Sequence, residues 1–176
     1  MAERLSYEDS CRELQALELI DADEIPPMPD QPPRCDDDEP LGVSFFRTSL
    51  SDVALEGLTL PRTFFGRSEI DSVSFRNTDL SESVANWNDF KDTDFSDTNL
   101  TNCDLRACIF ERVKFNGACL RNADIRHCTF TDCDFAGAEV AGLKITKAGA
   151  ARLGLSNEQL RDIAWQADQG EEPDGG

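Results

Sequence analysis

Between Thr93 and Ala107 the chain reads TDFSDTNLTNCDLRA, a stretch in which one pattern of five residues occurs three times. Each pentad has a small residue, then Asp or Asn, then Phe or Leu, then two further small or polar residues. A period of five fits neither an α-helix, which has 3.6 residues per turn, nor a strand, whose side chains alternate. It is typical of a chain that bends sharply once in every pentad.

The same period extends in both directions from this stretch. Every fifth residue from Phe45 to Ile145 is a large apolar residue, except Ala85. The pattern has one break, over residues 81–89, where Trp87 appears. A small residue stands two places before most of these central residues. Four pentads close a square coil, and coils stacked about 4.8 Å apart would bury both kinds of residue in one column.

The pentads that begin at Thr93, Thr98, Cys103 and Ala123 resemble the pentapeptide-repeat family. The resemblance extends over residues 43–145, about 60% of the chain. It implies an all-β solenoid, a right-handed quadrilateral β-helix of about five coils. The family serves many roles, so the resemblance indicates a fold more strongly than an activity.

The flanks of the repeats have a different composition. Residues 1–42 hold 13 acidic and 3 basic residues and several prolines, which predicts an acidic, Pro-rich arm with a short helix over residues 10–20 and a flexible linker. The arm either solubilises the protein and covers the first coil, or it binds a partner or masks a site. The helix offers four apolar residues for docking: Leu14, Leu17, Leu19 and Ile20. We expect the β-helix over 43–146, a cap with a helix over 147–169, and a disordered tail over 170–176.

A solenoid needs caps, because its last coil exposes apolar interior and unpaired strand edges. Ser156 and Gln159 have the spacing of a capping box, which predicts the start of a helix. Its apolar face would consist of Leu160, Ile163, Ala164 and Ala167, with Trp165 nearby. We interpret this helix as the C-terminal cap, and a homodimer formed through the helix is the alternative.

Composition excludes several classes of function. The chain has 35 acidic and 17 basic residues, a net charge of −18, which opposes direct binding to nucleic acid. No apolar stretch is long enough to span a membrane, and no signal peptide is recognisable, so we expect a cytoplasmic protein. Its seven cysteines are then reduced thiols, and four serve as small inward residues: Cys103, Cys108, Cys128 and Cys133.

No catalytic, metal or cofactor site is expected. The chain has no CxxC pattern and its one histidine is His127, so a Cys/His metal site is not indicated. The many carboxylates would stand in open solvent, where nothing tunes their pKa for acid–base chemistry. We therefore predict that the protein is not an enzyme.

Residues 20 apart should stack on one side of the coil, which sorts the exposed residues into faces. The first face, around the column that runs from Phe45 to Ile125, carries four Arg and two Asp for a net charge of +2, whereas the next face has a net charge of −5. Trp and Arg are enriched at interaction hot spots. The predicted partner-binding residues are Arg47, Phe64, Arg67, Trp87, Arg106, Arg126 and His127. Two alternatives stay open: Trp87 folds inward to fill the space beside Ala85, or the arginines only balance charge, with the acidic arm as their partner.

Three functions remain. The first is a protein that binds and inhibits a protein partner, above all an antitoxin or immunity protein that neutralises a toxin. The second is implied by the resemblance: some pentapeptide-repeat proteins mimic DNA and modulate gyrase in quinolone resistance. We rank it lower, because the repeats carry a net charge of only −5 and five coils span about 24 Å, less than a DNA turn of about 34 Å. The third is a structural or adaptor module.

Overall fold

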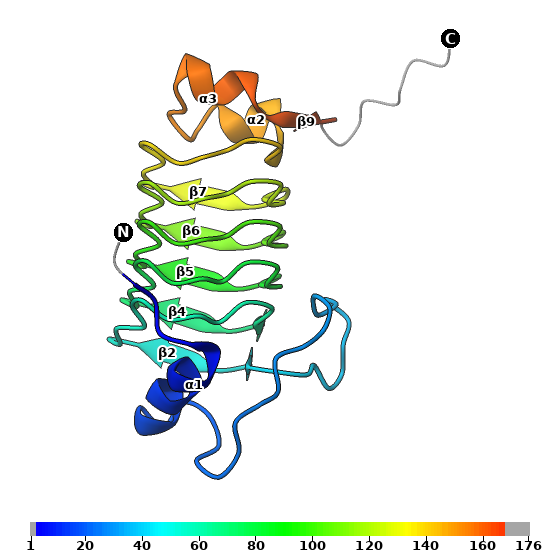
Figure 1. Cartoon of the computed structure of the whole chain (residues 1–176). Helices are drawn as coiled ribbons and strands as arrows, with labels where there is room; N and C mark the ends of the chain where they lie inside the picture. The colour runs from blue at the N-terminus through cyan, green and yellow to red at the C-terminus, as the bar shows by residue number, and fades with distance from the viewer. Residues whose placement is uncertain (1–2, 168–176) are drawn as a thin grey trace.

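The chain forms a stack of square coils with one helix at its N-terminal end and two short helices at the other end (Figure 1). This computed structural model describes residues 3–167, so the predicted disordered tail over 170–176 lies outside the described residues. The helices are α1 (Tyr7–Ala16), α2 (Lys147–Ala150) and α3 (Asn157–Arg161). The solenoid that the five-residue period predicts is confirmed.

The strands are short and follow one another along the stack. Their bounds are β1 (Ser44–Phe46), β2 (Ser49–Ser51), β3 (Phe64–Gly66), β4 (Glu69–Asp71), β5 (Asp89–Lys91), β6 (Ile109–Glu111), β7 (Thr129–Thr131), β8 (Lys144–Thr146) and β9 (Ala164–Gln166). One sheet has the order β2-β4-β5-β6-β7, while β1 pairs with β3 and β8 pairs with β9. All these pairs are parallel, and each residue lies beside the residue 20 positions further on.

Single parallel bridges continue this register between the strands. On the side of β1 and β3 they join one residue per coil in turn: Phe64, Val84, Asp104, Asp124 and Lys144. From there Lys144 pairs with Ala164 in β9. About six turns are therefore stacked, one more than the sequence predicts. The extra turn arises because the capping segment, 147–163, is long enough to bring the chain back into the 20-residue register.

The bend in each pentad is visible in the backbone angles. Every fifth residue from Gly42 to Gly142 has a positive φ, between +49° and +83°. Glycine, Asn and Asp tolerate this left-handed conformation, and they occupy many of these corners. Bulkier residues occupy others, and Trp87 is the largest of them, with φ at +62°. The corners make each pentad one side of the square.

The central residues fill the interior as stacked rings and aliphatic groups. Phe75 and Phe95 stack with centroids 5.2 Å apart, Phe95 and Phe115 at 5.4 Å, and Phe115 and Phe135 at 4.6 Å. All four of these phenylalanines are buried, and Phe75 has no exposed surface. The prediction that a narrow apolar column holds the coils together is confirmed.

The break in the sequence pattern over residues 81–89 does not interrupt the coil. Ser83 and Asn88 occupy the small inward positions of two consecutive pentads and are 3% and 0% exposed. Ala85 occupies a central position and is 3% exposed. The pentads look irregular in sequence because the inward and central residues are unusual ones, whereas the register of the coils continues through them.

The small inward residues also join successive coils by hydrogen bonds. The Thr98 hydroxyl donates to the carbonyl oxygen of Phe75 at 2.7 Å, 23 residues earlier in the chain. The Cys103 thiol donates to the carbonyl oxygen of Leu80 at 3.0 Å in the same way. The cysteines predicted as packing residues therefore donate hydrogen bonds as well, and all seven thiols of the chain are free. Burial raises the pKa of the Cys103 thiol to about 12.

Helix α1 covers the N-terminal end of the stack. It begins after Ser6, whose side chain accepts a hydrogen bond from the Asp9 amide, so it starts earlier than the predicted range of 10–20 and ends at Ala16. Cys11 and Leu14 are fully buried against the first coil, and the Thr59 amide donates to the Ser10 hydroxyl at 2.8 Å. Leu14 docks as expected and Leu19 and Ile20 are partly buried, whereas Leu17 is 43% exposed and does not dock.

The C-terminal cap differs from the single helix that the sequence predicts. The capping box of Ser156 and Gln159 is confirmed, with both reciprocal hydrogen bonds present. Helix α3 ends after five residues, and Ala164 belongs to β9 rather than to a helical face. Gln159 explains the early end, because its side-chain amide donates to the carbonyl oxygens of Phe135 and Ala138 and ties the first turn to the coil below. Beyond it the chain pairs with β8 as a strand.

Candidate protein-binding face

The first face contains a vertical row of corner residues, one from each coil. This corner column consists of Arg47, Arg67, Trp87, Ala107 and His127, all with positive φ. The Trp87 side chain is 67% exposed. The alternative in which it folds inward beside Ala85 is therefore excluded. The structure brings four of the predicted partner-binding residues into this column: Arg47, Arg67, Trp87 and His127.

The N-terminal end of the first face is apolar. Phe46 is 52% exposed, and its ring centroid lies 6.4 Å from that of Phe64. Phe64 itself is 4% exposed, so its predicted availability to a partner is wrong. Gly66 allows this arrangement, because a Cβ atom there would lie 2.7–2.8 Å from the two phenylalanine rings. The Arg47 guanidinium lies 5.2 Å from the centroid of the Phe46 ring.

The acidic arm lies against the same face. After α1 the chain makes a wide loop before it enters β1 (Figure 1). Arg62 donates through Nη1 to the carbonyl oxygen of Pro29 at 2.6 Å, and Pro33 is buried. Residues 32–36 of the arm share a cavity of about 430 Å³ with Val84 on the first face. Val84 points outward in the repeat yet is 5% exposed, which indicates that the arm covers part of the face.

The C-terminal half of the first face carries a ladder of ion pairs. Arg106 and Asp104 join at 2.7 Å (Nη2 to Oδ2), and Arg126 and Asp124 join at the same distance one coil further on. Arg106 also lies 3.8 Å from Asp124, which links the two coils. Arg106 and Arg126 therefore balance charge, as one alternative predicts, but their partners are carboxylates of the face itself and not of the acidic arm.

The ladder fixes the orientation of its side chains. Partial burial acts to raise the pKa of Asp104, but hydrogen bonds from the Arg106 side chain and amide outweigh it and hold that pKa below its usual value. Asn86 adds a hydrogen bond from Nδ2 to Asp104 at 3.2 Å, while its buried Oδ1 has no hydrogen-bond partner in the described chain. Arg106 and Arg126 are thus less available to a partner than the two arginines of the corner column.

Two exposed apolar residues of this region were not among the predicted binding residues. Phe46 and Leu41 are 52% and 67% exposed. Phe46 directly follows a central residue, so the five-residue period places it outside, and its size is a usable signal. Leu41 lies in the arm, where no periodicity indicates its position.

A model of the family described as pentapeptide repeats matches residues 48–84 and 89–126 with eight copies. The chain is a pentapeptide-repeat protein. The interval between the two matched ranges contains Ala85 and Trp87, where the sequence departs from the pattern while the coil continues. No curated protein matches this pentapeptide-repeat protein.

Solved structures of other pentapeptide-repeat proteins share the architecture. HetL, which is involved in heterocyst differentiation regulation in the cyanobacterium Nostoc, gives a TM-score of 0.55 at 15% identity, over 57% of this chain and 48% of HetL. Rfr23 from the cyanobacterium Cyanothece gives 0.48 at 13% identity, over 70% of this chain and 88% of its own. QnrB1, a plasmid-mediated fluoroquinolone resistance protein, gives 0.39 at 27% identity, over 56% and 53%. The likeness to HetL shows a common fold, and the matched region spans about half of HetL.

Two other kinds of site are not found among residues 3–167. No helix in this range has the length and apolarity needed to cross a membrane. No group of three or more His, Cys, Asp or Glu side chains in this part of the chain is placed to hold a metal ion.

Proposed function

We propose that this pentapeptide-repeat protein is a non-catalytic inhibitor that binds a protein partner through the corner column of its first face, as an antitoxin or immunity protein binds a toxin. The observation that carries the proposal is Trp87. A bulky residue is costly in a left-handed conformation, and an exposed indole adds no core packing in return. Such a residue is more easily explained by binding than by stability.

The surroundings of Trp87 fit a protein surface of mixed or acidic character. Arg47 and Arg67 precede it in the corner column, and for Arg67 no ion pair is recorded within the described residues. Arginine and tryptophan together are the residue types that dominate binding energy in protein interfaces. The net charge of −18 opposes binding to nucleic acid, so the proposed partner is a protein.

The proposal places the protein in the cytoplasm. All seven cysteines lie within the described residues and are free thiols, as expected in a reducing compartment. An inhibitory rather than catalytic role is supported by the carboxylates that arginines engage on the faces, such as Asp104, Asp92 and Glu139.

Modulation of gyrase by DNA mimicry is the second candidate, favoured by the acidic side chains that flank the sheet from β2 to β7. Two observations make this candidate less favourable than the first. Arg112 pairs with Asp92 at 2.7 Å and also with Glu111, which offsets part of the negative charge in the middle of this face. About six turns span roughly 29 Å, less than a DNA turn of about 34 Å. A supercoiling assay with gyrase separates the candidates, because a mimic inhibits or protects the enzyme at stoichiometric concentration.

We further propose that any homodimer forms through the C-terminal end of the rod. Helix α3 has no buried residue of its own, and Trp165 in β9 is 40% exposed above the last coil. Sedimentation equilibrium of the protein and of Trp165→Ala tests this: weaker association of the variant supports the interface, and unchanged association contradicts it.

The experiment for the main proposal compares Trp87 and Arg67 with exposed residues elsewhere on the rod. Where a gene next to its own encodes a toxin candidate, the two proteins are produced together, and toxin activity and co-purification are measured. We expect Trp87→Ala with Arg67→Glu to weaken binding at least tenfold, about the loss of one hot-spot residue. Ile109→Ala with Arg76→Glu is the control, since it removes an exposed apolar group and an exposed arginine outside the corner column. Equal loss in both variants, or no loss in the first, would reject the corner column as the site.

A further inference from the structure

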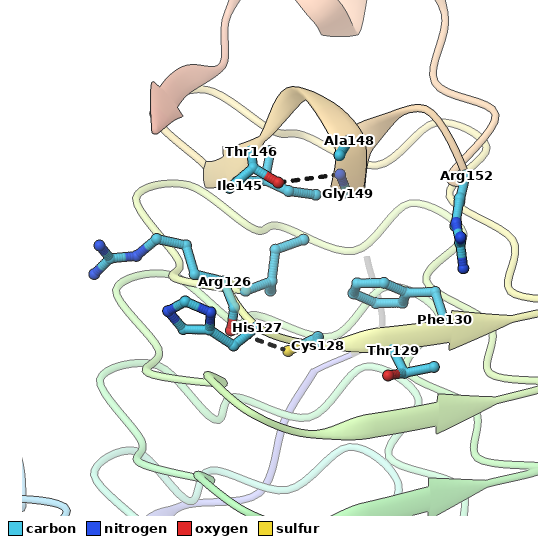
Figure 2. A pocket seen from close by; sticks show the side chains of 11 residues that line it. Arg126, His127, Cys128, Thr129, Phe130, Ile145, Thr146, Ala148, Gly149 and Arg152 are labelled. Carbon is cyan, nitrogen blue, oxygen red and sulfur yellow. Dashed lines mark hydrogen bonds between the residues drawn. The ribbon is translucent and has the colours of Figure 1, made fainter. Parts of the chain in front are cut away.

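The five-stranded sheet ends at β7, and a cavity lies above its free edge. The cavity has a volume of about 330 Å³ and is lined by β7, by the corner residues before it and by α2 (Figure 2). In the coils below, each strand of this sheet has the next strand above it. Above β7 the chain instead forms α2, so within the described residues no strand covers this edge.

The cavity is floored by an aromatic ring that lacks its stacking partner. Phe90, Phe110 and Phe130 stack in one column with centroids 5.1 Å apart at both steps. The residue 20 positions after Phe130 is Ala150, which is buried in α2 and has no ring. Phe110 has no exposed surface, whereas Phe130 is only partly buried and lines the cavity. The upper face of Phe130 therefore resembles one half of a stacked pair.

The backbone at this edge also lacks the bond that each lower coil makes. The amides of Asp92 and Arg112 donate to carbonyl oxygens 19 residues further on, at 2.9 Å and 2.8 Å. In the described chain no such bond is recorded for Asp132, the equivalent residue after β7. An extended peptide laid along β7 would accept that hydrogen bond and continue the sheet, as in strand addition.

The side chains that line the cavity include two arginines and one histidine, and no carboxylate. Arg126 and His127 extend outward at one end of the slot, and Arg152 lies at the other end beyond Phe130 (Figure 2). Arg126 is held by Asp124, whereas no ion pair is recorded for Arg152 within residues 3–167. In a chain with a net charge of −18, the two arginines at the ends of the slot favour an acidic ligand.

We propose that this slot binds an extended acidic segment of another protein, which pairs with β7 as an added strand and stacks one aromatic side chain on Phe130. The slot meets the corner column at His127, but neither Trp87 nor Arg67 lines it. Its ligand is defined by three features: an extended backbone, a central ring, and carboxylates at both ends that meet Arg126 and Arg152.

The probe is a fluorescein-labelled heptapeptide, Glu-Asp-Thr-Phe-Thr-Asp-Glu, titrated with the full chain in an anisotropy assay. We expect saturable binding tighter than about 1 mM. Ala148→Trp fills the slot from the exposed side of α2 and should abolish binding. Arg152→Glu should weaken it about fivefold, while Arg161→Glu, the same change on α3 outside the slot, and Trp87→Ala should leave it unchanged.

Hydrogen exchange locates the peptide independently of the variants. The amides of Phe130 and Asp132 should exchange more slowly when the peptide is bound, and a peptide with Ala in place of Phe should bind more weakly. Absence of saturable binding, binding that survives Ala148→Trp, or equal losses for Arg152→Glu and Arg161→Glu would overturn the proposal. A chain ending at residue 167 that binds the peptide tenfold more tightly would also overturn it, since the protein's own acidic tail would then be the occupant.

Discussion

Removal of the Phe110 ring from the interior of the rod should lower the free energy of unfolding strongly. Phe110 has no exposed surface, stacks on Phe90 and Phe130 at 5.1 Å, and meets the edge of Phe115 at 5.5 Å. A buried Phe→Ala change costs about 3–5 kcal/mol through lost transfer energy and the remaining cavity. Aromatic pairs add about 0.5–1.5 kcal/mol each. We therefore expect Phe110→Ala to lower the free energy of unfolding by about 5 kcal/mol.

Phe130 is the matched comparison, because it is the same residue at the open end of the same column. It stacks on one side only and is partly buried, so Phe130→Ala should cost about half as much, roughly 2–3 kcal/mol. Urea denaturation followed by circular dichroism measures both values, and Phe110→Leu at about 1 kcal/mol shows whether loss of stacking alone is tolerated. The reasoning fails if Phe130→Ala costs as much as Phe110→Ala, or if Phe110→Ala costs less than about 2 kcal/mol.

Three further predictions address the ladder, the corners and the thiols. The pKa of Asp104 lies below its usual value, so its contribution to the free energy of unfolding is present above about pH 4 and is lost as the pH falls below that. Asp104→Asn should therefore lower the free energy of unfolding by about 1 kcal/mol at pH 7 and make stability less dependent on pH in the acid range. Urea denaturation from pH 7 to pH 2 measures both effects. Gly137 has a φ of +71°, and an added Cβ atom there would meet only an ordinary van der Waals contact, so Gly137→Ala should destabilise by about 1 kcal/mol, while equal thermal stability would contradict the corner strain. Cys103 is buried and the pKa of its thiol is raised to about 12. At pH 8 a maleimide reagent should therefore label exposed Cys35 and leave Cys103 unmodified until the protein unfolds. Mass spectrometry measures the labelling of each cysteine.

The five-residue period was sufficient to predict the coil, the inward residues and the stacking of residues 20 apart, because each pentad repeats one local conformation. It also placed Trp87 and Arg67 on the same face. It did not predict that Phe64 is buried. The period predicts that a residue beside a central position points outward, but such a residue is exposed only where nothing else covers it. Phe64 is buried and its ring lies beside that of Phe46, and such contacts between coils carry no periodic signal.

The ends of the rod were harder to predict for a related reason. The capping box of Ser156 is local and was predicted correctly, whereas the end of α3 depends on Gln159 reaching carbonyl oxygens of the coil below. Strand β9 depends on the register set by β8. The slot above β7 exists because α2 replaces a strand, and a helix of four residues leaves no amphipathic pattern from which to predict it.

The constant spacing of 20 residues between paired positions makes the length of this molecule adjustable in discrete steps. Duplicating one complete circuit, such as residues 88–107, would lengthen the rod and leave every side chain beyond it on its original side. Inserting a single pentad would preserve the interior equally well, but it would rotate everything downstream by a quarter of a revolution. The ligand-facing surface can thus be shortened, extended or reoriented by gain and loss of short segments, without redesign of what lies inside.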